Sequence, residues 1–244
     1  MAKVGRPPQD PARQLERAHR ILDAAAELIL RWGYDKTTID DVAKQAGVAK
    51  GTIYLHWKTR DALFAALLRR ERVRMLGEVR AQAPATLRAL LAELSAAMLR
   101  RPLMRALLVG DTEVLGKLAR QKRGRTRDLP LEAFQDYLGE LDKRGALRPD
   151  RTPVEREAIL GSVVYGFLVA QSVLPESARV PDDRLVELLA DTGDRAISTE
   201  GTPTDDDARA IAEATLDYLE TVEEIAQRKL AVSLGGDPSK ERVT

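Results

Sequence analysis

The chain has 244 residues, of which 44% are hydrophobic and 32% charged, and this composition is typical of a globular protein. It contains no cysteine, which excludes disulfides, thiol nucleophiles, iron–sulfur clusters and thiolate zinc sites. Two histidines, His19 and His56, lie too far apart in sequence for a paired-ligand motif. We therefore expect no metal centre, no cofactor, no Ser–His–Asp catalytic group and no enzyme.

The formal net charge of +1 conceals an uneven distribution along the chain. Residues 1–80 carry 16 Lys and Arg against 10 Asp and Glu, whereas residues 81–244 carry 23 against 28. A basic first third predicts that this part alone meets a polyanion such as nucleic acid. The alternative is an uneven scatter of charges without a function.

The low aromatic content of 4% and the abundance of Ala, Leu and Arg favour helices over strands. Apolar spacing and the placement of Gly, Pro and capping residues predict helices over 13–32, 39–45, 50–57, 60–82, 85–100, 102–120, 128–145, 153–174 and 205–230. We expect a flexible basic arm over 1–12, a long connection over 175–204 with a brief helical pattern at 183–189, and a disordered tail over 235–244.

Neither a secretory signal nor a membrane span is expected. The first ten residues contain no apolar segment, and Gly and Ser interrupt the most apolar run, residues 158–174. The protein is therefore expected to be soluble and cytoplasmic.

Residues 38–58, TIDDVAKQAGVAKGTIYLHWK, have the spacing of a helix-turn-helix. The small Ala43 stands where a second helix would cross the first, and Gly47 suits a left-handed turn. The apolar residues of the shared inner face would be Val42, Ala46, Val48 and Ile53.

The second helix of this motif would carry the contacts to DNA. A helix in the major groove reads bases with residues near its N-terminus, where Lys50, Gly51 and Thr52 stand. Lysine donates to guanine, glycine permits close approach and threonine offers a hydroxyl and a methyl group. Donors that suit phosphate oxygens follow at Tyr54, His56 and Lys58.

The run from Gly47 to Tyr54, followed by His56-Trp57-Lys58 and Leu63, resembles the DNA-binding domain of TetR-type repressors over about residues 14–65. The resemblance implies an all-α fold with an N-terminal three-helix helix-turn-helix domain and a larger helical ligand-binding and dimerisation domain. It also implies a homodimer that binds a palindromic operator in double-stranded DNA and is released by a small-molecule effector.

The resemblance assigns Thr38 to the phosphates together with Tyr54, His56 and Lys58, and it places Trp57 in the interior. Ala49 departs from the family, which often has Ser or Thr there as a helix cap, at a cost of about 1 kcal/mol. The expected domains are the arm (1–12), the helix-turn-helix domain (13–60), a connecting helix (61–82) and the ligand-binding and dimerisation domain (83–234).

Two further basic segments can contact polyanions. In the arm, Lys3 and the Arg6 of Gly5-Arg6-Pro7 can enter an A·T-rich minor groove, the alternative being a solvated tail. The run 120–127 is read as an exposed interhelical loop, with an acidic ligand or partner as the alternative.

Segments 154–174 and 205–230 are the expected dimer interface, although both could be core helices. Candidate pocket residues, chosen because such side chains line apolar cavities, are Met98, Met104, Phe134, Tyr137, Tyr165, Phe167 and Gln171. A ligand-responsive repressor is the preferred function. An architectural DNA binder, an enzyme with a DNA-binding head and a transcriptional activator remain alternatives.

Overall fold

The computed structural model describes residues 10–115 and 128–235. Within these ranges the regular structure is helical, apart from an isolated antiparallel bridge between Leu147 and Ser198, so the predicted all-α fold is confirmed. No helix in the described part of the chain has the length and apolarity needed to cross a membrane. The helices are α1 (Pro11–Trp32), α2 (Ile39–Ala46), α3 (Lys50–His56), α4 (Arg60–Ala81), α5 (Leu87–Leu99), α6 (Pro102–Val109), α7 (Thr112–Leu115), α9 (Asp128–Lys143), α10 (Pro153–Val173), the 3₁₀ turn η2 (Glu176–Ala178), α11 (Asp182–Ile197) and α12 (Asp205–Ser233).

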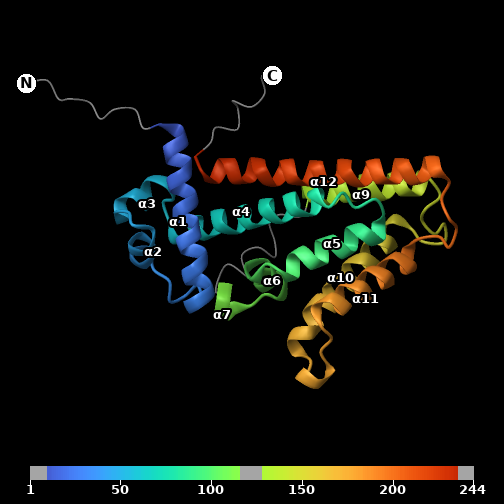
Figure 1. The fold of residues 1–244 in the computed structure, drawn as a ribbon, viewed down its shortest axis with the longest axis horizontal. Helices are drawn as coiled ribbons and strands as arrows, with labels where there is room; N and C mark the ends of the chain where they lie inside the picture. Colours follow the sequence, from blue (N-terminus) through green and yellow to red (C-terminus); the bar gives the residue numbers. More distant parts are fainter. Residues whose placement is uncertain (1–9, 116–127, 236–244) are drawn as a thin grey trace, which may run out of the picture.

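Helices α1, α2 and α3 gather at one end of the molecule, and α4 runs from them into the larger helical part (Figure 1). Helix α1 begins at Pro11, so the predicted arm over 1–12 is wrong at its last two residues. The reason is local: the Asp10 carboxylate accepts a hydrogen bond from the Ala12 N–H at 3.0 Å, and Pro11 suits a first helical position.

The predicted helix over 102–120 is interrupted after Val109. Gly110 adopts a left-handed conformation, with φ of 70°, and its N–H bonds to the Ala106 carbonyl, which ends α6. The short α7 then follows, and residues 116–127 lie outside the described part of the chain.

The predicted long connection over 175–204 is also wrong, because residues 182–197 form α11. One face of this helix buries Leu185, Leu189 and Ile197 against the larger core, where α11 packs on α5 and α10. The burial of these apolar side chains against α5 and α10 stabilises α11 as a helix, although the residues on either side of it are polar.

Helix α12 lies along α4 and α9 (Figure 1). Segment 205–230, which the sequence assigned to a dimer interface, has an apolar stripe that includes Ile211, Val222 and Ile225, and this stripe is buried within the protomer. An ion pair of 2.6 Å from Arg80 Nε to the Glu223 carboxylate also joins α4 to α12. Most of the predicted tail, residues 236–244, lies outside the described residues.

Candidate nucleic-acid interface

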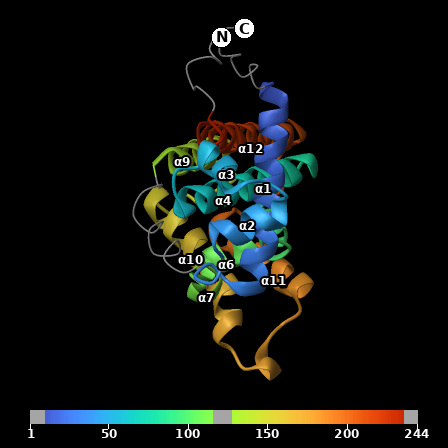
Figure 2. The same ribbon diagram turned by 90° about the vertical axis from the view of Figure 1, so that its left-hand side faces the viewer.

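The corner between α2 and α3 has the geometry that the sequence predicts. Gly47 has a left-handed φ of 64°, and the next N–H, that of Val48, bonds to the Ala43 carbonyl at 3.0 Å. Val42 and Ile53 are fully buried, and α2 packs against both α1 and α3. Figure 2 shows α1, α2 and α3 at the end of the molecule that is turned to the viewer.

The opposite face of α3 is open. Lys50 and Gly51 are exposed and Thr52 is half-buried, so the three residues predicted to face bases reach the surface. A Cβ atom built on Gly51 would meet nothing within 4 Å. Packing inside the protein therefore does not require glycine at this position, which leaves room for an external surface to approach the backbone closely.

Lys50 has a partner that the sequence analysis did not identify. Its ammonium lies 2.8 Å from the Asp40 carboxylate at the start of α2, and both side chains are at least half exposed. The hydrogen bond to Asp40 raises the pKa of Lys50, which therefore stays charged. DNA must compete with Asp40 for this lysine.

Thr38 forms a capping box with Asp41 at the start of α2. The Thr38 hydroxyl accepts from the Asp41 N–H at 3.2 Å and donates to the Asp41 carboxylate at 2.6 Å. These hydrogen bonds lower the pKa of Asp41. Thr38 is exposed, and its contact with a DNA phosphate stays a prediction.

Helix α3 begins without a side-chain cap, because Ala49 stands at its N-cap. Ala49→Ser supplies an oxygen for the N–H groups of the first turn, and we expect it to raise the free energy of unfolding by about 1 kcal/mol. Denaturant unfolding measures the change. Ala81→Ser, at the exposed C-terminal end of α4, is the control and should not stabilise the protein. An Ala49→Ser protein no more stable than the wild type would contradict this prediction.

The three residues predicted to face phosphates differ in exposure. Tyr54 and Lys58 are exposed, whereas His56 is half-buried, with its ring centroid 5.2 Å from that of Trp57. Trp57 itself is buried, as the resemblance implied. Arg17 on α1 was not singled out in the sequence, yet it lies close enough for its charge to act on His56.

His56 makes folding stability depend on pH. Burial, and then the charge of Arg17, lower its pKa below the ordinary value of 6.5, and the pKa of His19 is lowered in the same direction by burial and by Arg70. Below about pH 6.5 the unfolded chain therefore binds more protons than the folded one. We expect the free energy of unfolding to fall from about pH 7.5 to about pH 5.5, and His56→Gln to flatten this dependence. Denaturation at a series of pH values measures it, and an unchanged slope in the variant would contradict the role of His56.

Two predicted contacts lie outside the described residues, namely Lys3 and Arg6 of the arm and the basic run 120–127. Their roles stay predictions.

The predicted pocket residues do not gather around one cavity. Phe134 and Tyr137 on α9 form an aromatic cluster with Tyr218 of α12, in which Tyr137 and Tyr218 stack with centroids 5.3 Å apart. The other five lie on α5, α6 and α10, where Met104 and Gln171 are buried, Met98 and Phe167 are half-buried and Tyr165 is exposed. None of the seven lines either of two cavities between the described helices. Their role in ligand binding stays a prediction.

The fold and the exposed α3 face define a helix-turn-helix protein. Residues 21–67 match the family model described as bacterial regulatory proteins, tetR family. Relatives include the fatty acid metabolism regulator protein of Bacillus subtilis, 44% identical over 50 residues, and the HTH-type transcriptional repressor Rv1474c of Mycobacterium tuberculosis, 39% identical over 59 residues. These matches cover 20% and 24% of this chain and only 26% and 32% of the two relatives.

A solved structure of a TetR-family transcriptional regulator from Mesorhizobium loti has the same fold. It matches with a TM-score of 0.54 at 17% identity, and the match covers 77% of this chain and 99% of that one. The resemblance inferred from the sequence thus agrees with the family model over residues 21–67, the segment that contains the helix-turn-helix. One relative is described as a regulator and the other as a repressor.

Proposed function

We propose that the protein is a cytoplasmic transcriptional repressor that binds a palindromic operator as a homodimer and is released by a small-molecule effector. The observation that carries this proposal is α3, whose buried Ile53 fixes the helix while Lys50, Gly51 and Tyr54 face outward. A short helix with exposed basic and aromatic donors, held by a helix-turn-helix, suits the major groove. The descriptions of the relatives support repression.

Helix α10 supports a dimer. Residues 158–173 contain no charged side chain, and exposed positions along this helix include Gly161, Tyr165 and Val173, the last two being 50% and 80% exposed. An exposed apolar helix face with small residues allows close approach of a second copy. Segment 205–230 can contribute only through outer side chains such as Leu216, because its apolar stripe is buried within the protomer.

Tyr165→Glu is expected to weaken the dimer at least tenfold, because it buries an unpaired charge in an apolar interface. Sedimentation at a series of protein concentrations measures the dissociation constant. Leu216→Glu introduces the same charge on α12 and should have a smaller effect. A wild-type protein that sediments as a monomer at micromolar concentration would contradict the dimer.

Contacts between the two parts of the chain support release by an effector. The Tyr34 N–H, just after α1, donates to the Val114 carbonyl of α7 at 2.8 Å, and the Arg70 guanidinium of α4 lies 2.8 Å from the Asp23 carboxylate of α1. A ligand that favours another position of α4 or α7 would therefore move α1, and with it the spacing of the two recognition helices in a dimer.

In-vitro selection of fragmented source-genome DNA by the purified protein tests the proposal. A palindrome enriched near a few promoters is the expected result, since a two-fold symmetric protein reads two half-sites. A diffuse A·T-rich preference would instead favour the architectural function and contradict operator binding.

A further inference from the structure

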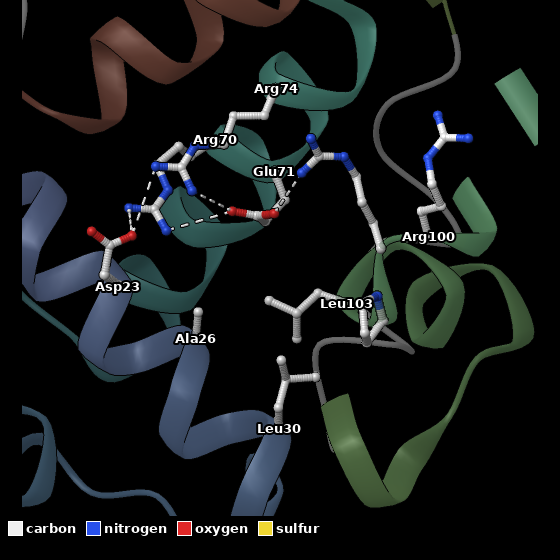
Figure 3. A pocket seen from close by; sticks show the side chains of 10 residues that line it. Asp23, Ala26, Leu30, Arg70, Glu71, Arg74, Arg100 and Leu103 are labelled. Carbon is white, nitrogen blue, oxygen red and sulfur yellow. Dashed lines mark hydrogen bonds and ion pairs between the residues drawn. The ribbon is translucent and has the colours of Figure 1, made fainter. Parts of the chain in front are cut away.

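A cavity of about 270 Å³ lies where the DNA-binding domain meets the rest of the protein (Figure 3). Its walls come from α1, α4 and the segment that leads into α6. The lining residues are Asp23, Ala26, Leu30, Arg70, Glu71, Arg74, Arg100, Arg101, Pro102 and Leu103. The volume is close to the lower limit of ordinary small-molecule sites, about 300 Å³.

The cavity has a charged side and an apolar side. Ala26, Leu30 and Leu103 lie together, opposite the guanidinium groups and carboxylates (Figure 3). Four arginines and two carboxylates line the cavity, and a third carboxylate, that of Glu78, pairs with Arg101 from outside the lining. Even with Glu78 counted, positive charge is in excess.

The arginines are not fully satisfied by these carboxylates. The side chain of Arg70 is 3% exposed and contacts the Asp23 carboxylate at 2.8 Å, the His19 carbonyl at 3.0 Å and the Glu71 carboxylate at 3.5 Å. Its Nε has no hydrogen-bond partner. Arg101 pairs with the Glu71 carboxylate at 3.0 Å and with Glu78, and its Nε is also buried without a partner. Each guanidinium therefore keeps N–H groups that the carboxylates of the described residues do not accept.

Two further features favour an anion at this place. Helix α6 begins beside the cavity without a side-chain cap, so N–H groups of its first turn are available. Arg74 also lies close to Arg70, and burial, followed by the charge of Arg74, lowers the pKa of Arg70.

We propose that this cavity binds a small monocarboxylate with a short apolar body. The carboxylate bonds to the guanidinium groups of Arg70 and Arg101, whose planar donors match its two oxygens. The apolar body packs on Ala26, Leu30 and Leu103. This binding does not depend on the proposed function, because it requires only the cavity.

Calorimetric titration of the full-length protein with benzoate tests the inference. Benzamide, which has the same ring but no charge, should bind at least tenfold more weakly, and inorganic phosphate should also bind more weakly because it leaves the apolar side empty. Equal binding of benzoate and benzamide, tighter binding of phosphate, or no heat with benzoate at millimolar concentration would each overturn the proposal.

Two variants locate the site independently. Arg101→Gln removes a guanidinium, and Ala26→Leu fills the cavity while keeping every charge. Each should weaken benzoate binding about tenfold or more. Arg184→Gln on the exposed side of α11 and Ala12→Leu at the exposed start of α1 are the matched controls, and both should bind benzoate as the wild type does. Unchanged binding in a folded Ala26→Leu protein would overturn the assignment to this cavity.

Discussion

Ile53→Ala is expected to lower the free energy of unfolding by about 2–5 kcal/mol, because it opens a cavity under the recognition helix. Ile53 is fully buried, and the other residues of α3 are at least partly exposed. With this anchor lost, α3 loses its fixed orientation on α2, so the variant should also lose sequence-specific DNA binding. Denaturant unfolding and a DNA titration measure the two effects.

Leu55→Ala is the matched control for stability, since it removes an aliphatic side chain two residues further along the same helix. Leu55 is 63% exposed, so its loss should change the free energy of unfolding by less than about 0.5 kcal/mol. Similar losses in the two variants would show that α3 is not anchored through Ile53.

Lys50→Ala is expected to reduce operator affinity by about 1–3 kcal/mol for each base pair that the lysine reads, or about 5- to 150-fold. It should also relax the base preference at that position. Competition between the selected operator and single-base variants measures both. An unchanged preference would refute a base-reading role for Lys50.

Asp40→Asn provides the complementary test. It keeps Lys50 but removes the carboxylate 2.8 Å away, which competes for the ammonium and repels phosphates. We expect tighter DNA binding and a steeper decline of affinity with salt, by about one unit of slope per released lysine. Weaker DNA binding in this variant would show instead that Asp40 orients Lys50 for its contact.

The sequence predicts the first four helices well because their ends depend on local chemistry. Thr38 and Thr59 cap helices with their own side chains, and Gly47 has the left-handed conformation that ends α2. Such signals act within a few residues and need no knowledge of the tertiary structure. The same locality explains why the open face of α3 could be predicted from residues 50–58.

The failures concern features that depend on distant parts of the chain. In α11, Gly193 suggests an irregular segment, but in the structure it lies so close to α5 that an added Cβ would be 2.8 Å from Leu91 Cδ1. Here the glycine serves close helix packing. The apolar periodicity of segment 205–230 indicates that one face of this helix is buried. It does not show whether that face packs inside the protomer or against a second copy. The Lys50–Asp40 pair joins two helices, and no pattern within either of them indicates it.

The hydrogen bond from Tyr34 to Val114 joins two peptide groups, so no ordinary side-chain replacement can delete it. Under the proposed release by an effector, a genetic screen for mutants that stay on DNA in its presence would therefore recover few changes at these two positions. Such mutants should concentrate at Gly33 and Gly110, which end α1 and α6 just before the bonded segments and whose φ angles of 79° and 70° other residues rarely adopt. Substitutions at these two glycines would then give a repressor that the effector no longer releases, although neither glycine would contact the effector or the DNA.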